Sequence, residues 1–221
     1  MARWTIVVWV VGCLVALPLA ARAGQPGADD GWVQLFNGND TTGWIDGGKP
    51  WLVEDSVLTW QKGCGYIWTK GRYGDFVLDL EFKVAPKCNS GVFFRTANLR
   101  NVVHTGIEMQ VLDSFGRKPS RNSCGAIYNC LAPAKTAVKK AGEWNRVTIT
   151  CKDNQITIVM NGQPIIDMDL NQWTEARKNP DGSKNKFKTA LKDFAREGHI
   201  GLQDHGKPVW YRNIRIKPLD K

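Results

Sequence analysis

Residues 76–84 read FVLDLEFKV, a stretch in which apolar side chains occupy every second position. Alternate side chains of an extended chain point to opposite sides, so this stretch predicts a β-strand with one apolar face. β-Branched and aromatic residues keep the same two-residue period from Trp32 onward, in short runs separated by Gly, Asn, Asp and Pro. The further predicted strands cover residues 91–95, 106–112, 144–151, 155–160, 163–169, 199–204 and 209–217.

The connections between these strands are mostly short. Asn161-Gly162, between two of the runs, is typical of a tight hairpin. Many short strands with almost no helical pattern predict an all-β domain of two packed antiparallel sheets. We therefore expect a jelly-roll β-sandwich of the concanavalin A-like kind.

One segment departs from this strand-and-turn pattern. It runs from Asn171 to Gly198, is rich in lysine, and has a helical pattern only over Lys188–Phe194. A loop of this length in a compact domain is usually a lid or a binding element. A solvent-exposed excursion fits the sequence about equally well.

The N-terminus has the order of an export signal. Arg3 precedes an apolar run over residues 6–19, and Ala21-Arg22-Ala23 offers a small-x-small cleavage site. We therefore predict that residues 1–23 are removed. A membrane anchor is the weaker alternative, because Pro18 interrupts a run that is already shorter than the roughly 20 residues of a spanning helix.

Removal of the signal leaves a length that one all-β domain can fill. We predict a short linker over residues 24–31 and a single domain over residues 32–219. A lipoprotein cleavage site at Cys13 is a minor alternative, since the apolar run continues past it. The protein is expected to be secreted or periplasmic and to have no membrane span.

The chain is basic, with 30 Lys and Arg against 21 Asp and Glu and a net charge of +9. Much of the excess lies between Arg177 and Arg196, whereas a nucleic-acid-binding face interleaves basic residues with exposed aromatic ones. We therefore expect no nucleic-acid partner. The sequence leaves the oligomeric state open.

Cysteine spacing gives little guidance to function. Of the six cysteines, one lies in the predicted signal, and the others follow no usual zinc-binding pattern. Export would permit disulfides, and Cys124 with Cys130 could close a short loop. The odd number that remains leaves at least one thiol unpaired, and the pairing is not predictable.

Several predicted strands carry polar side chains opposite their apolar ones. In GIEMQVL the alternation puts Glu108 and Gln110 on the outer face of the sheet. The same alternation puts Arg95 outward in its strand, and Gln203 and His205 outward in theirs. If these strands are neighbours, the residues form one polar floor that can hydrogen-bond sugar hydroxyls. The alternative is an ordinary solvent-facing sheet surface.

Asp113 has two possible roles. A β-bulge could return its carboxylate to the face of Glu108, or Asp113 could cap the turn before Ser114. This strand looks like the acidic strand of laminarinase-type β-glucanases, except that Gln110 replaces the middle acid and Asp113 the second glutamate. Both departures argue against ordinary retaining hydrolysis, which needs two carboxylates about 5 Å apart.

Several motifs together resemble one family, the 3-keto-disaccharide hydrolase domain of the concanavalin A-like lectin/glucanase superfamily. The resemblance spans residues 32–219. Its motifs are Leu35-Phe36-Asn37-Gly38, Gly43-Trp44, residues 90–95 (SGVFFR), residues 106–113 (GIEMQVLD), Gly125-Ala126-Ile127-Tyr128, residues 142–145 (GEWN), residues 198–206 (GHIGLQDHG) and residues 212–216 (RNIRI). It implies a concanavalin-like jelly roll and cleavage of oxidised glycosides as carbohydrate substrates.

A ketone at carbon 3 acidifies the proton on carbon 2, so a base can start elimination of the glycosidic oxygen from carbon 1. Such a site needs a base, a stabiliser of the enolate and an acid. We expect Glu108 as the base. We expect Arg95 and His205 to stabilise the oxyanion. Either Asp113 or Tyr128 is expected to donate the proton. Gln110 and Gln203 are expected to orient the sugar.

Two alternatives stay open from the sequence. A divalent cation could replace Arg95 as the electrophile, with Glu108, Asp113, Asp204 and His205 as its suspected ligands. No cofactor is otherwise predicted. The polar floor could also belong to a non-catalytic, lectin-like module that only binds a glycan.

Overall fold

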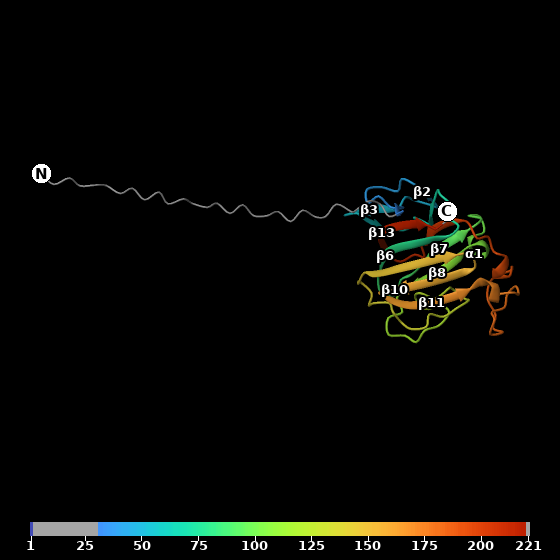
Figure 1. The fold of residues 1–221 in the computed structure, drawn as a ribbon. Helices are drawn as coiled ribbons and strands as arrows, with labels where there is room; N and C mark the ends of the chain where they lie inside the picture. The colour runs from blue at the N-terminus through green and yellow to red at the C-terminus, as the bar shows by residue number, and fades with distance from the viewer. Residues whose placement is uncertain (2–30, 220–221) are drawn as a thin grey trace. The chain divides into compact units, whose positions relative to one another are not determined.

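The computed structural model describes Met1 and residues 31–219, and its helices and strands all lie between Val33 and Pro218. Two antiparallel sheets pack face to face (Figure 1). The predicted export signal and linker lie, apart from Met1 and Gly31, outside the described residues, so both stay predictions. Within the described part of the chain, no helix is long and apolar enough to cross a membrane.

The larger sheet has eight strands in the order β11-β10-β9-β6-β13-β4-β3, and β1 pairs with β13. The smaller sheet has five, in the order β2-β5-β12-β7-β8. The strands of the larger sheet are β1 (Val33–Gln34), β3 (Leu52–Glu54), β4 (Val57–Thr59), β6 (Phe76–Val84), β9 (Asn145–Lys152), β10 (Gln155–Met160), β11 (Gln163–Asp169) and β13 (Val209–Pro218). Those of the smaller sheet are β2 (Trp44–Asp46), β5 (Ile67–Thr69), β7 (Asn89–Thr96), β8 (Ile107–Leu112) and β12 (His199–Leu202).

The core lies between the two sheets. The alternating apolar residues of β6 are all fully buried, as the FVLDLEFKV pattern predicts. Across the interior, Phe76 of β6 meets Phe94 of β7 edge to face, with ring centroids 6.4 Å apart. The two sheets therefore bury their facing apolar sides against each other.

The expected strands and hairpin are present. β6, β10 and β11 have the predicted bounds, and the other predicted strands differ from the observed ones by at most a few residues. Asn161 and Gly162 have φ angles of 50° and 77°, the left-handed conformation that a two-residue hairpin turn requires at both positions. The all-β prediction is confirmed.

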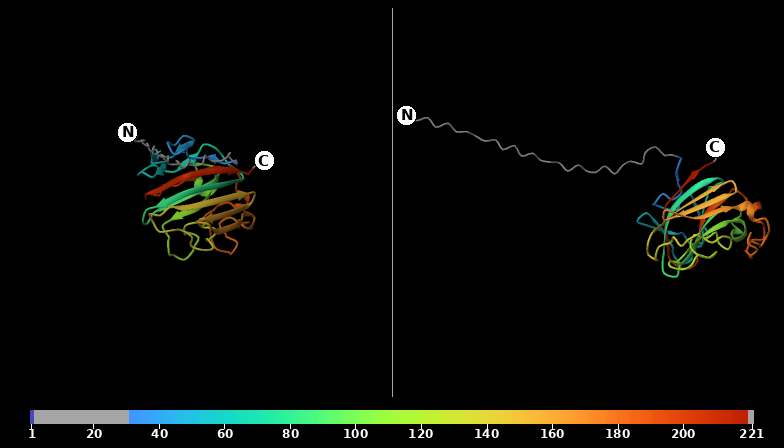
Figure 2. Two further views of the ribbon diagram at one scale, coloured as in Figure 1. Left: turned by 60° about the vertical axis from the view of Figure 1, so that its left-hand side comes forward. Right: turned by 60° about the horizontal axis from the view of Figure 1, so that its bottom comes forward.

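The predicted helix over Lys188–Phe194 is wrong. That stretch contains only the single 3₁₀ turn η2 (Leu191–Asp193), and a further turn, η1 (Leu170–Gln172), follows β11. Phe194 packs edge-on against Phe187 at 5.2 Å instead of extending a helix, and Arg196 donates hydrogen bonds to carbonyl groups of the turn. The segment 171–198, orange in Figures 1 and 2, leaves the sandwich at β11, the edge of the larger sheet.

The loop between β7 and β8 holds a four-residue helix, α1 (Val102–Thr105), that the sequence pattern does not predict. All five described cysteines are buried free thiols, so the pairing of Cys124 with Cys130 is not formed. Burial raises the pKa of the Cys88 thiol to about 12. Such thiols are structural, since the reactive thiolate is disfavoured.

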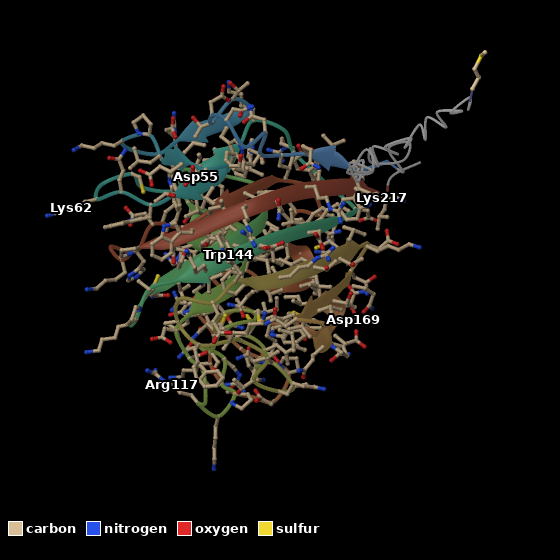
Figure 3. All side chains as sticks on the ribbon, turned by 90° about the vertical axis from the view of Figure 1, so that its left-hand side faces the viewer. Asp55, Lys62, Arg117, Trp144, Asp169 and Lys217 are labelled. Atoms are coloured by element: carbon tan, nitrogen blue, oxygen red, sulfur yellow. The ribbon has the colours of Figure 1, made fainter. Side chains whose placement is uncertain are left out.

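The outer face of the larger sheet carries ion pairs and aromatic rings that contact cations. Asp79 accepts hydrogen bonds from Thr148 and Arg146, at 2.9 and 3.1 Å. Trp144, labelled in Figure 3, packs against the guanidinium of Arg212, which lies 4.0 Å from the ring centroid. These groups thus satisfy one another on the outer face of the larger sheet.

Candidate active site

A cavity of about 320 Å³ lies against the outer face of the smaller sheet. Its walls combine one carboxylate, one ammonium group, one imidazole, several amides and aromatic rings. The lining residues are Tyr66, Asn89, Phe93, Val103, Glu108, Gln110, Tyr128, Lys186, Gln203 and His205. We call this cavity the polar pocket.

The register of the smaller sheet explains why these side chains meet. Glu108 of β8 lies opposite Phe93 of β7, and Phe93 lies opposite Gly201 of β12. Cross-strand partners share a face of the sheet, so Glu108 and Phe93 both point outward. Met109, the next residue of β8, is fully buried in the core. Glu108 and Gln110 therefore lie on the outer face, as their alternation with apolar residues indicates.

A glycine makes room for the carboxylate. Gly91 of β7 is the cross-strand partner of Gln110, and a Cβ atom at position 91 would lie 2.6 Å from Oε1 and 3.1 Å from Cγ of Glu108. The side chain of Glu108 thus lies directly over Gly91. Any larger residue there would displace the carboxylate.

Gly91→Ala is therefore expected to lower the turnover of the polar pocket by about 10²-fold, the loss typical of a displacement near 1 Å. The fold should survive, because the clash falls on the flexible end of a side chain, and we expect a stability loss of about 1–3 kcal/mol. Kinetics together with thermal denaturation measure both. Gly71→Ala is the matched control, since its Cβ would meet the Tyr73 hydroxyl at 2.8 Å outside the pocket. Equal turnover in the two variants would contradict this geometry.

Glu108 is nearly buried, with 5% of its surface exposed. Burial raises its pKa, while the nearby charges of Lys186 and then His205 act in the opposite direction. The Nζ atom of Lys186 lies 3.3 Å from Oε2 of Glu108. A buried carboxylate with a raised pKa beside a cation is well suited to take a proton at neutral pH.

Lys186 reaches the pocket on a hairpin within the long basic segment. The amide of Arg177 donates to the carbonyl of Phe187 at 2.7 Å, which closes the hairpin. Asn179, which is 3% exposed, accepts a hydrogen bond from the indole of Trp173 and donates one to the carbonyl of Asn129. The segment is therefore fixed to the domain, and it supplies a wall of the pocket.

Tyr128 stands beside this ion pair. Its backbone amide donates to the carbonyl of Glu108 at 2.9 Å, because residues 125–128 run along the outer edge of β8. The Nζ atom of Lys186 lies 4.4 Å from the centroid of the Tyr128 ring. The cation thus contacts an aromatic face and a carboxylate at once.

Amides and aromatic rings form the rest of the pocket lining. The side-chain amide of Gln203 donates to the hydroxyl of Tyr66 at 2.9 Å. The Tyr66 ring packs against Trp68 and Phe93, each with centroids 5.7 Å away. Gln110 donates to Asn89 Oδ1 at 3.1 Å on the neighbouring strands. These amides can hydrogen-bond hydroxyl groups of a ligand, and the aromatic rings can stack against its apolar face.

Arg95 is not in the polar pocket, which corrects its predicted outward placement. It has no exposed surface, and its guanidinium bonds to Asp75 at 2.8 Å and to the carbonyls of Gly74 and Asp153. The register between β7 and β12 shifts beside it, and its φ angle is 49°. This bulge breaks the two-residue alternation and turns the side chain inward.

Arg95→Met is expected to lower the free energy of unfolding by about 3–5 kcal/mol, because it leaves buried polar groups without their cation. Urea denaturation measures the loss. Arg72→Met is the matched control: its ion pair with Glu197 is largely exposed, so its loss should cost less than about 1 kcal/mol. Similar values for both variants would show that Arg95 does not stabilise the fold in this way.

Asp113 also lies outside the pocket lining. It follows the end of β8, and its carboxylate accepts a hydrogen bond from the backbone amide of Lys87 at 2.8 Å. The bulge that would return it to the face of Glu108 is absent, since the pairing of β7 with β8 continues without a register shift from Phe94–Ile107 to Asn89–Leu112. Its position fits a loop-capping carboxylate better than a proton donor.

The suspected metal ligands do not come together. Asp204 accepts hydrogen bonds from the indole of Trp60 and from the amides of Gly65 and Gly206. Among the described residues, no group of three or more His, Cys, Asp or Glu side chains is placed to hold a metal ion. Glu108, Asp113, Asp204 and His205 therefore form no joint ligand set here.

The structure thus brings together Glu108, Gln110, Tyr128, Gln203 and His205. The sequence prediction missed the other lining residues, which are Tyr66, Asn89, Phe93, Val103 and Lys186. Phe93 had a usable signal, because it lies two residues after Gly91 on the predicted strand 91–95, whereas Asn89 precedes the start of that predicted strand. Lys186 had no signal in the sequence beyond the charge of its segment. Long-range packing places Lys186 beside Glu108.

A Bacillus subtilis protein described as having a galectin-like fold superimposes with a TM-score of 0.55 at 14% identity, covering 84% of this chain and 94% of that one. This likeness confirms the jelly-roll fold alone. The sequence model of the 3-keto-alpha-glucoside-1,2-lyase-like domain matches residues 31–217. The chain belongs to this family.

Individual relatives agree with that membership. A "3-keto-disaccharide hydrolase" from Bacteroides thetaiotaomicron is 28% identical over 86% of this chain and 79% of its own length. A crystal structure of a candidate glycosyl hydrolase from Parabacteroides distasonis superimposes with a TM-score of 0.79 at 35% identity, covering 85% of this chain and 99% of that one. A second protein of that organism, described in the same way, has a TM-score of 0.68 at 25% identity over 86% and 94% of the two chains. The chain is thus of a carbohydrate-active, glycosyl hydrolase-like family.

Proposed function

We propose that this protein cleaves 3-keto-glycosides by base-assisted elimination followed by addition of water. The observation that carries the proposal is the pairing of Glu108 with Lys186 inside the polar pocket, where one buried carboxylate lies 3.3 Å from one ammonium group. Family membership supplies the class of substrate to be tested.

Direct displacement of a glycoside ordinarily uses two carboxylates, about 5–5.5 Å apart in retaining enzymes and about 6.5–9.5 Å apart in inverting ones. Glu108 is the one carboxylate among the residues that line the pocket in the described part of the chain. Asp113, the second acid considered from the sequence, bonds to the amide of Lys87 instead. A single base suits elimination, because that reaction begins with loss of one proton.

In the proposed first step, Glu108 takes the proton from carbon 2 of the sugar. The electrons of that C–H bond form an enolate with the ketone at carbon 3. The enolate then re-forms the ketone, a double bond forms between carbons 1 and 2, and the bond from carbon 1 to the glycosidic oxygen breaks. The leaving oxygen takes a proton. Water then adds across the double bond, with its hydroxyl on carbon 1 and a proton on carbon 2.

The neighbouring groups suit the other roles. Lys186 replaces Arg95 as the cation that stabilises the developing oxyanion, because its ammonium group already faces Glu108. The imidazole of His205 also lines the pocket, and we assign it to the same task as a hydrogen-bond donor. Tyr128, whose ring contacts Lys186, is the candidate donor to the leaving oxygen. Gln110 and Gln203 orient the sugar.

We further propose that the protein is exported. The support is the order of Arg3, the apolar run over residues 6–19 and Ala21-Arg22-Ala23. Determining the N-terminal residue of protein recovered outside the cytoplasm tests this point. A chain that begins at Met1 there would contradict cleavage.

The test of the activity is release of a chromogenic leaving group from a 3-keto-glucoside, run beside the unoxidised glucoside. We expect release from the keto sugar alone, because only the ketone acidifies the proton on carbon 2. Equal release from both sugars would point to direct hydrolysis. Binding without release from either would indicate a lectin-like module.

A further inference from the structure

One end of the polar pocket holds an acceptor with no partner. Three buried side-chain polar atoms lack a hydrogen-bond partner among the described residues, and Gln203 Oε1 is the one that belongs to a pocket residue. Gln203 is 7% exposed. An unsatisfied amide oxygen at this depth is costly, so a structure retains one mainly where a ligand or a water completes it.

The backbone of Gln203 is held firmly. Its amide donates to the carbonyl of Gly91 at 3.0 Å, and its carbonyl accepts from the hydroxyl of Ser90 at 2.6 Å. Its side-chain amide donates to the hydroxyl of Tyr66 at 2.9 Å. The Tyr66 ring is in turn packed against Trp68 and Phe93. Neither group can readily turn away to satisfy itself elsewhere.

The pair offers a ligand one donor and one acceptor. With Nε2 donating to the Tyr66 oxygen, the free groups are the Gln203 oxygen and the Tyr66 O–H. If the amide is turned over, the Tyr66 O–H donates to the amide oxygen. The free groups are then the amide N–H and the phenol oxygen. In both arrangements the complement is a group that donates and accepts at once, which is a hydroxyl.

We infer that Tyr66 and Gln203 together bind one particular hydroxyl of the sugar and make the pocket selective for it. The inference rests on the proposed function in one respect, namely that the ligand is a sugar. The backbone amide of Gln203 donates to the carbonyl of Gly91, over which the Glu108 carboxylate lies. The side chains of Tyr66, Gln203 and Glu108 all line the polar pocket, so one sugar in the pocket can contact the pair and the base together. An analogue without that hydroxyl leaves buried polar groups unpaired, which is the strongest form of discrimination against a missing group.

The experiment measures binding by calorimetry in the Glu108→Gln background, so that no turnover is needed. The probes are methyl 3-keto-glucoside and its analogues that lack the hydroxyl at carbon 2, 4 or 6 in turn. We expect one analogue to bind about 10- to 100-fold more weakly than the parent, the value of a buried hydrogen-bonded pair. Adding Gln203→Met or Tyr66→Phe should abolish that difference, while Gln163→Met, a control at an exposed glutamine of β11 outside the pocket, should preserve it.

The outcomes are distinguishable. Discrimination that survives in both the Gln203→Met and the Tyr66→Phe variants, or equal binding of all analogues, would overturn the inference and leave a bound water as the partner of Gln203. Elimination could still take place in that case. Failure of the parent sugar to bind would instead overturn the sugar ligand, and the inference with it. Circular dichroism of each variant verifies that it is folded.

Discussion

Glu108→Gln is expected to reduce the turnover of a 3-keto-glycoside by about 10²- to 10⁴-fold, the usual contribution of a general base. Glutamine keeps the size of the side chain and its place over Gly91, but its amide cannot accept the proton from carbon 2. Binding of the sugar should therefore be nearly retained. Initial rates and calorimetry on the same preparation separate the two effects.

Glu175→Gln is the matched control for this change. Glu175 lies in the same long segment as Lys186 and forms an exposed ion pair with Lys178, so its loss should leave the rate unchanged. A Glu108→Gln variant that turns over as fast as Glu175→Gln would remove Glu108 from the reaction. A variant that loses binding and turnover equally would assign Glu108 to binding alone.

Lys186→Met is expected to lower kcat/KM by about 10²- to 10³-fold, the loss seen when one group that stabilises an oxyanion is removed. It should also move the acid limb of the pH profile. Lys186 lowers the pKa of Glu108, and burial raises it. Without the cation the Glu108 pKa rises further, so activity disappears at a higher pH as the solution is acidified. His205, the other residue that lowers the pKa of Glu108, remains in place.

Lys186→Arg should recover part of the rate and return the acid limb toward that of the wild type. Lys188→Met is the matched control, because Lys188 is exposed two residues away and does not line the pocket. A loss of rate in Lys186→Met without any movement of the acid limb would show that Lys186 acts only by holding the hairpin in place.

The strands of this fold are predictable because their signal is local. β6 carries its apolar residues in strict alternation, and the same rule puts Glu108 and Gln110 on the outer face. The rule fails at Arg95, where a bulge and a positive φ angle interrupt the alternation. Bulges are set by how two strands pair, and one strand's sequence does not reveal its register.

Lys186 illustrates the other limit. Its segment has no periodicity, and its position depends on Asn179 reaching Asn129 and Trp173, contacts that no local pattern encodes. The charge of the segment is as compatible with a solvent-exposed loop as with a binding element that lines the pocket. The choice between the two roles of Asp113 is not local either, because its partner, the amide of Lys87, lies in the connection between β6 and β7.

The proposed elimination requires that the proton on carbon 2 leaves during cleavage. This step is tested by measuring the deuterium content of carbon 2 in the 3-keto sugar that is released in deuterium oxide. The background is the deuterium that free 3-keto sugar takes up in buffer alone and in the presence of the Glu108→Gln variant. Elimination and hydration predict one solvent deuterium at carbon 2 for each glycoside cleaved. Product that keeps its original hydrogen at carbon 2 beyond that background would contradict the mechanism and indicate direct hydrolysis.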